Sequence, residues 1–261
     1  MKFTTLTEDS TCGTLTPEHG LCIYIETEKH RILFDLGSTD LFIKNASLLG
    51  IDLTLVDTVV ISHGHDDHGG GLEAFLHIND HARIYLQEAA FLDHFTKKPS
   101  GPEYIGLNQD LKTHPQVHLL NGNAILDEQL QIFSHVTGEV YETNKNLLKE
   151  DLERDDFVHE QHLVISENGK HALLMGCGHK GVLNILRQCP VSPDVVIGGF
   201  HLYSMRSGQM LPEEVIMELV RGLPDAVYYT GHCTGEEALR ILKREVPNMH
   251  ALRAGTEIIL E

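Results

Sequence analysis

The stretch that decides the fold begins with Thr58 to Ser62 (TVVIS) and continues with His63 to His68 (HGHDDH) and three glycines at 69–71. Its β-branched and apolar start predicts a buried strand, and its glycines let the following backbone fold tightly. Four potential metal ligands thus come directly after a strand, where α/β proteins collect their sites. A chance cluster in a His-rich chain is the alternative, but the order of strand, ligands and glycines argues against it.

The spacing within this stretch predicts two metal ions. Residues two apart in an extended loop point the same way, so His63 and His65 can hold one ion. Asp67 and His68 follow after the chain turns and can reach a second ion. Imidazole with one carboxylate suits zinc, and also iron, manganese or nickel. We therefore expect two divalent metal ions, with zinc as the first candidate.

Three further histidines come just past the ends of apolar strands. His179 follows the run 173–178, His201 follows 195–200 and His232 follows 227–231. Each has glycine beside it or one to three residues away, and strand ends of this kind feed into sites. We predict His179 and His232 as metal ligands. His201 is predicted to act as a general acid or as a partner of a developing oxyanion, with a metal-ligand role as the alternative.

Asp35 ends another strand, Arg31 to Asp35, and precedes Leu36 and Gly37. A carboxylate in this position can accept the second ring N–H of a metal-binding histidine and so fix the orientation of that ring. A simple turn aspartate is the alternative interpretation.

Strand and helix patterns alternate along the whole chain, which predicts a single α/β domain over residues 1–261. The segments 88–95 and 97–115 are predicted to be a helix and a loop. The charged run 143–160 is interpreted as solvated surface, with a flap as the alternative. The other expected strands are 21–27, 83–87, 117–120, 130–134, 162–166, 171–176, 194–198, 226–230 and 257–260, and the other expected helices are 40–49, 72–78, 182–188, 212–222 and 236–245.

Composition limits the possible partners and location. The formal net charge is −18, and like charges repel nucleic acid and anionic membranes. We therefore expect a small-molecule substrate, no nucleic acid and no membrane. The first residues contain no apolar signal segment, and five scattered cysteines do not form a disulfide pattern, so we expect a cytoplasmic protein.

The chain contains 18 histidines. Twelve of them lie outside the motifs above, and we interpret these as part of a His-rich surface. They are His19, His30, His77, His81, His94, His114, His118, His135, His159, His162, His171 and His250.

These motifs together resemble the metallo-β-lactamase superfamily, whose hallmark is His-x-His-x-Asp-His after a strand. The chain is most similar to the branch typified by archaeal dihydropterin ribofuranosylaminobenzene phosphate synthases and their bacterial relatives. The resemblance covers almost the whole chain. It is carried by the segments 19–21, 33–37, 62–72, 137–139, 176–181, 184–186, 198–202 and 232–235.

The resemblance implies an αββα sandwich of two mixed β-sheets flanked by helices, with the metals at one sheet edge. It implies that His63 and His65 hold the first ion with His179, and that Asp67 and His68 hold the second with His232. Many superfamily members have a bridging aspartate where this sequence has Cys177. A thiolate bridge, no protein bridge, or an inert buried thiol are the alternatives here. The Pro-Arg pair that follows residues 137–139 in the branch is absent.

The function that these features predict is metal-dependent hydrolysis by a binuclear centre. An activated hydroxide would attack a small-molecule ester, phosphoester or amide-like substrate, and Asp67 could receive the proton of the water. A pterin-related transferase or synthase that uses the same site is one alternative. A non-catalytic, metal-dependent small-molecule sensor is another.

Overall fold

The computed structural model describes residues 1–205 and 207–261 and contains two seven-stranded mixed sheets. In each sheet the neighbouring strands pair antiparallel at one end and parallel at the other. The first sheet has the order β19 (Glu257–Ile259), β1 (Lys2–Thr7), β2 (Cys22–Glu26), β3 (Arg31–Phe34), β4 (Thr58–Val60), β5 (Arg83–Gln87) and β8 (Val117–Leu120). The second has the order β18 (Met249–Ala251), β17 (Val227–Thr230), β14 (Val195–Ile197), β13 (Lys170–Leu174), β12 (Gln161–Glu167), β10 (Leu130–Ser134) and β9 (Ala124–Ile125).

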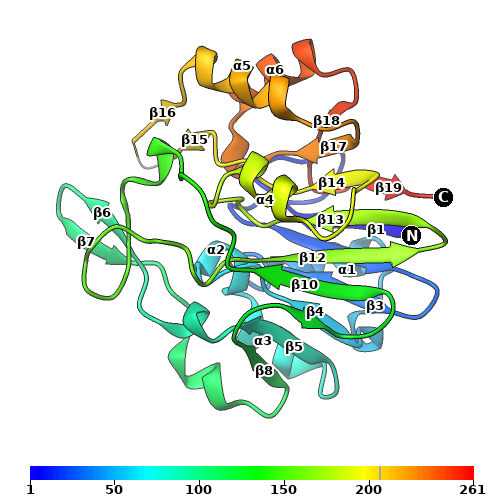
Figure 1. The fold of residues 1–261 in the computed structure, drawn as a ribbon. Coiled ribbons are helices and arrows are strands. Elements are labelled where there is room, and N and C mark those ends of the chain that lie inside the picture. Colours follow the sequence, from blue (N-terminus) through cyan, green and yellow to red (C-terminus); the bar gives the residue numbers. More distant parts are fainter. Residues whose placement is uncertain (206) are drawn as a thin grey trace.

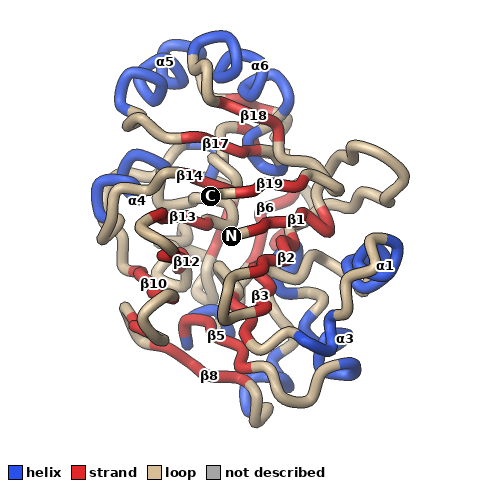
Figure 2. Tube along the Cα trace, turned by 90° about the vertical axis from the view of Figure 1, so that its right-hand side faces the viewer, coloured by secondary structure: helices blue, strands red, loops and turns tan. Residues whose placement is uncertain are grey.

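Helices cover the outer face of each sheet, as Figures 1 and 2 show. The helices are α1 (Leu41–Leu48), α2 (Asp66–Gly69), α3 (Leu72–Ile78), α4 (Val182–Gln188), α5 (Glu213–Gly222) and α6 (Glu236–Glu245). Helices α1 and α3 pack on the first sheet, and α4, α5 and α6 pack on the second. The expected αββα sandwich of two mixed sheets is confirmed.

Strand periodicity explains how the layers are held together. In β3, Ile32 and Phe34 point into the core shared by the two sheets, whereas Leu33 between them points to the helices. Ile23 and Ile25 of β2 face the same shared core, as do Leu163 and Ile165 of β12. Because side chains alternate faces along a strand, each apolar run fills two cores at once.

Most expected elements are confirmed, with boundaries that shift by a residue or two. The turn at Asn168 and Gly169 joins β12 to β13, and both residues have positive φ (+53° and +75°), as a tight hairpin turn requires. No helix among the described residues is long and apolar enough to span a membrane.

Two predictions in the middle of the chain were wrong. The helix over 88–95 is only a 3₁₀ turn at Glu88–Phe91, and the loop 97–115 contains strand and 3₁₀ structure. A small sheet forms there from β11 (Leu147–Leu148), β6 (Phe95–Lys98) and β7 (Gly101–Tyr104). Pro102 fits in this sheet because β7 is its edge strand. A second small hairpin pairs β15 (Tyr203–Ser204) with β16 (Gln209–Met210).

The charged run 143–160 is only partly a solvated surface. Glu150 to Arg154 are exposed, but Asn144, Asp155, His159 and Glu160 are buried. The charged side chains in the middle of the run led to the prediction of a solvated surface, whereas residues at both of its ends pack into the interior.

Candidate metal centre

The predicted site residues meet at one edge of the sandwich, because they follow the carboxyl ends of parallel strands. His63 follows β4 and Asp35 follows β3 in the first sheet. His179, His201 and His232 follow β13, β14 and β17 in the second sheet. The two sheets therefore each deliver part of the site to the same place.

Three of these residues have a strained backbone. Asp35, His201 and His232 have φ of +57°, +46° and +48°. Side chains other than glycine rarely adopt this region, and such strain gathers at functional sites.

The structure brings the predicted ligands together in two groups. His63, His65 and His179 form one group, and Asp67, His68 and His232 form the other, together with Cys177. Within each group one ligand atom per residue lies within 4.8 Å of the others. His201 belongs to neither group, although its ring centroid is 4.4 Å from that of His179.

Asp35 orients two of the rings. Its Oδ2 accepts a hydrogen bond of 2.6 Å from Nδ1 of His68 and one of 2.8 Å from the hydroxyl of Ser62. Because the Ser62 hydrogen is used in this way, its oxygen accepts from Nδ1 of His63, at 2.8 Å. Both rings therefore carry their hydrogen on Nδ1 and present a lone pair at Nε2.

Asn144 and Asp9 orient the rings of His179 and His232. Nδ1 of His179 donates to Oδ1 of Asn144 at 2.7 Å, and Nδ1 of His232 donates to Oδ1 of Asp9 at 2.7 Å. The backbone N–H of His232 donates to Glu8. Neither Asn144 nor Asp9 was predicted from the sequence.

The Nε2 atoms of the four rings converge in pairs. Nε2 of His63 lies 3.3 Å from Nε2 of His179, and Nε2 of His68 lies 3.3 Å from Nε2 of His232. The lone pairs of His63 and His179 repel each other at this separation unless a cation lies between them. With zinc–nitrogen bonds of about 2.05 Å, tetrahedral ligands are about 3.3 Å apart. The donor set therefore fits metal ions.

Electrostatics agree with this arrangement. Burial, together with the neighbouring rings, holds the pKa of His63, His65 and His179 well below the usual histidine range, so these rings are neutral. Burial raises the pKa of Asp67, but His68 and His232 outweigh it, and the pKa stays well below normal. Asp67 is therefore an ionised carboxylate.

His232 differs from the other rings. Burial lowers its pKa, but hydrogen bonds to Asp67 and Asp9 outweigh this and raise the pKa well above normal. Without an ion, a proton therefore binds between His232 and Asp67, whose Oδ2 lies 3.3 Å from Nε2. A metal ion must displace that proton to bind here.

Cys177 lies inside the second group. Its Sγ is 3.2 Å from Nε2 of His68, and burial raises the pKa of the thiol well above normal. This position fits a thiol that donates to the bare nitrogen in the metal-free protein, and equally a thiolate that binds an ion.

The hydrogen bonds of His201 do not favour the predicted role as a proton donor. The hydroxyl of Thr143 donates to the carbonyl of His201 at 2.7 Å, so its oxygen accepts from Nδ1 of the same ring, at 3.2 Å. Burial lowers the pKa of His201 to about 3. The neutral ring thus presents a lone pair at Nε2 and can accept a hydrogen bond.

Several histidines assigned to the surface lie in the interior or at the site. His94, His159 and His162 are buried. His19 lines the same cavity as His179 and His201, and its Nε2 is 3.3 Å from Oδ2 of Asp67. The segment 19–21 carried a family resemblance, and that was the one signal in the sequence that pointed to His19.

Two cavities open onto the centre. One of about 90 Å³ lies over His65, Asp67, His179 and His201. A second of about 210 Å³ lies beside it and shares His232, Tyr203 and Met205 with the first.

Comparisons with known proteins agree with this geometry. The model of the Metallo-beta-lactamase superfamily matches residues 15–144. The 7,8-dihydropterin-6-methyl-4-(beta-D-ribofuranosyl)-aminobenzene-5'-phosphate synthase of Methanocaldococcus jannaschii is 28% identical, with 96% of this chain and 95% of the synthase covered. An uncharacterized protein of the same organism is 27% identical, with 87% and 88% covered. The crystal structure of Tm1679, a metal-dependent hydrolase of the beta-lactamase superfamily, has a TM-score of 0.83 at 28% identity, with 100% of this chain and 99% of that chain covered.

Proposed function

This chain belongs to the metallo-beta-lactamase superfamily, and from that premise we propose that it is a cytoplasmic metal-dependent hydrolase with a binuclear centre. The substrate is a small-molecule ester, phosphoester or amide-like compound. The observation that carries the proposal is the pairwise convergence of four Nε2 atoms, each ring held by a hydrogen bond at Nδ1.

The candidate ligands form two sets, one for each ion. His63, His65 and His179 hold the first ion, and Asp67, His68 and His232 hold the second, with Cys177 within reach of the latter. Zinc suits this mixture of imidazole and carboxylate, as do iron, manganese and nickel. When bound, the ions supply an acidified water and stabilise the negative charge that develops on the substrate oxygen.

The side chains around the centre handle the proton and the substrate. Asp67 is ionised and faces the cavity, so it can receive the proton of the attacking water. His201 can accept a hydrogen bond through Nε2, which suits a hydroxyl or N–H group of the substrate. The small cavity takes the reacting group, and the adjoining larger cavity takes the remainder of a small molecule.

A synthase is the second candidate function. It is favoured by the 28% identity to the pterin synthase over nearly the whole of both chains. Such an enzyme forms product only when both of its substrates are present, whereas a hydrolase needs one substrate and water.

Metal stoichiometry tests the proposal first. The protein is purified without added metal or chelator, and zinc, iron, manganese and nickel are measured by ICP-MS. We expect about two equivalents per chain, and hydrolysis of chromogenic phosphoesters and esters that is abolished by a chelator and restored by the ion found. A chain that stays empty after reconstitution with each ion overturns the binuclear proposal. Two bound ions with ligand-induced stabilisation but no turnover point to a sensor.

A further inference from the structure

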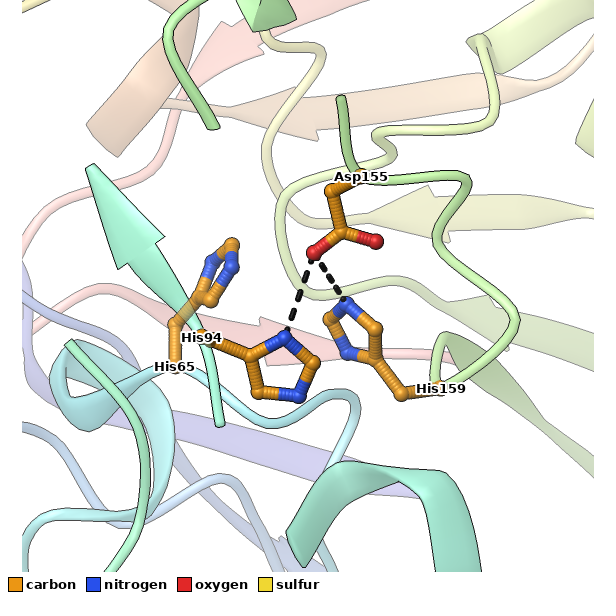
Figure 3. A group of neighbouring side chains, drawn as sticks. All are labelled: His65, His94, Asp155 and His159. Carbon is orange, nitrogen blue, oxygen red and sulfur yellow. Dashed lines mark hydrogen bonds and ion pairs between the residues drawn. The ribbon is translucent and has the colours of Figure 1, made fainter. Parts of the chain in front are cut away.

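A second cluster of buried histidines lies directly beside the metal centre (Figure 3). His94, Asp155 and His159 surround His65 at the start of α2, and one ligand atom from each of the four lies within 4.8 Å of the others. All four residues are buried, with exposures of 1–6%. By residue type alone this cluster would hold a third ion. It can do so only if its ring nitrogens have lone pairs that no other group uses.

His159 has no lone pair to offer. Its Nδ1 accepts the backbone N–H of Gly64 at 2.9 Å, so the hydrogen of the neutral ring is on Nε2. That Nε2–H donates to Oδ2 of Asp155 at 3.1 Å (Figure 3). Both nitrogens of the His159 ring therefore have hydrogen-bond partners, and neither has a free lone pair for an ion.

His94 differs, because a neutral ring carries one hydrogen and can donate to only one of its two neighbours. Its Nδ1 lies 3.2 Å from Oδ2 of Asp155, and its Nε2 lies 3.3 Å from the carbonyl oxygen of Ala89. Carboxylate and carbonyl oxygens only accept, so both nitrogens face acceptors. Asp155 itself is held by the N–H of Phe157, which donates to Oδ1 at 2.7 Å.

The cluster contacts the predicted metal-binding loop, residues 63–68. Gly64 lies between His63 and His65, and a side chain at this position would collide with the Ala90 carbonyl and the His94 ring. The ring centroid of His65 is 5.4 Å from that of His159 and 5.7 Å from that of His94. Nε2 of His65 is buried without a hydrogen-bond partner among the described residues, so packing against these two rings fixes its orientation.

The same segment also reaches the third ligand of the first ion. Glu160, next to His159, accepts the backbone N–H of His179 at 2.7 Å and that of Lys180 at 3.0 Å. Asn144, near the start of the segment, orients the His179 ring. Residues 143–160 thus contact the loops that carry all three ligands of one ion.

We propose that His94, Asp155 and His159 form a hydrogen-bonded brace that positions Gly64 and His65 and thereby sets the affinity of the first metal ion. They are positioning residues and hold no ion of their own. The inference rests on the proposed binuclear centre, whose first ion is held by His63, His65 and His179.

A pair of substitutions at His159 tests the brace. Glutamine can accept the Gly64 N–H through its amide oxygen and donate to Asp155 through its amide nitrogen, but it is a poor metal ligand. Leucine can do neither. Zinc is titrated into metal-free wild type, His159→Gln and His159→Leu in competition with a chromogenic chelator, which reports the equivalents bound and a Kd for each ion.

We expect two equivalents in all three proteins. In His159→Leu one Kd should weaken by about 10–100-fold while the other stays unchanged, because partners behind a ligand typically contribute this much. His159→Gln should stay close to wild type. A general loss of protein stability would weaken the affinity for both ions. A change in one Kd alone therefore indicates a local effect. If His159→Leu does not fold, Asp155→Asn provides the test, because an amide that accepts from the rings at Oδ2 would place its NH2 group against the Phe157 N–H.

Two outcomes overturn the brace while the binuclear proposal stands. One is an unchanged pair of Kd values in His159→Leu. The other is three equivalents in wild type with one lost in His159→Gln, which would make the cluster a metal site. A wild-type protein that binds no ion overturns the binuclear centre itself, and the brace with it.

Discussion

The two histidine clusters differ in what their nitrogens are bonded to, and hardly at all in residue type or burial. In the candidate metal centre, each of His63, His68, His179 and His232 is anchored at Nδ1 and turns Nε2 towards the other candidate ligands. In the brace, His159 has a hydrogen-bond partner at both nitrogens, and both nitrogens of His94 face acceptor oxygens, to one of which the neutral ring can donate. The comparison shows that the number of available lone pairs, more than the number of histidines, separates a metal site from a hydrogen-bonded support.

The oxygen partners explain how the difference arises. Asp35 and Asp9 each accept from the Nδ1 atoms of rings whose other nitrogen faces the centre. Asp155 instead accepts from two rings whose remaining nitrogens contact backbone groups, the N–H of Gly64 and the carbonyl of Ala89. The Gly64 N–H uses the one lone pair of His159, and this backbone contact is enough to remove that histidine from the set of ligands.

The largest effect is expected from His232→Ala, which removes one of the four convergent nitrogens. The metal content should fall from two equivalents to one, and turnover should fall by about 10³-fold or more, because metal-assisted charge stabilisation supplies several kcal/mol. ICP-MS and initial rates with a chromogenic phosphoester measure both. His77→Ala on the exposed face of α3 is the matched control and should match wild type. Two retained ions in His232→Ala would contradict the ligand assignment.

The next effect concerns His201, which lies beside the centre but in neither group. In His201→Ala the metal content should stay at two equivalents, while turnover falls by about 10–100-fold, because a substrate hydroxyl or N–H left without its hydrogen-bond partner costs about 1–3 kcal/mol. Metal analysis and kcat distinguish the roles. Loss of one equivalent would make His201 a ligand, and unchanged kcat would remove it from the reaction.

The structure brings the predicted ligands together, and the sequence could indicate them because its signals are local. The ligands His63 to His68 stand in one run, and His179 and His232 each follow an apolar strand near glycine. Parallel pairing then brings those strand ends together, so the topology that follows from alternating strands and helices places the ligands.

The partners of these ligands could not be predicted in the same way. Asp9, Asn144 and Asp155 come from segments without regular periodicity, and each contacts a histidine that is distant in sequence. A charged run such as 143–160 is usually solvated, and nothing local shows which of its ends is buried. Histidine is also ambiguous in sequence, because exposed, bracing and ligating histidines look alike until their two nitrogens are placed.

A smaller effect is expected when the anchor behind a ligand is changed. In Asp35→Asn one amide position can only donate, so the side chain cannot accept both from Nδ1 of His68 at Oδ2 and from the backbone N–H of Ser62 at Oδ1. Affinity for one ion should weaken by about 10–100-fold. Asparagine tolerates the positive φ of this position, so backbone strain does not confuse the result.

Chelator competition measures this affinity. Asp57→Asn is the matched control, because Asp57 pairs with Nδ1 of His30 at 2.9 Å, away from the centre. A change of equal size in both variants would show that the Asp35 effect is a general loss of charge and not a loss of orientation.

The smallest effect concerns His162, a third kind of buried histidine. It has no hydrogen-bond partner at either nitrogen among the described residues, and the nearest charged group is Glu160, with Oε2 3.9 Å away. An unpaired buried polar group costs about 1–3 kcal/mol, so His162→Leu should raise the free energy of unfolding of the metal-free protein by roughly that amount at pH 8.

The pH dependence of that difference gives the sharper test. Burial lowers the pKa of His162 to about 3, whereas in the unfolded chain it is about 6.5. The unfolded chain therefore binds a proton that the folded protein does not, and the contribution of His162 to stability is lost as the pH falls from about 6.5 towards 3. At pH 5 this loss is about 2 kcal/mol, so the advantage of His162→Leu over wild type should grow by about that much between pH 8 and pH 5. Urea unfolding measures it for both metal-free proteins in a Glu160→Gln background, because burial raises the pKa of the neighbouring Glu160 to about 7 and its own titration falls in the same range. An advantage that stays constant with pH would mean that His162 finds a partner in the folded protein, and the distinction between paired and unpaired buried histidines would fail at this position.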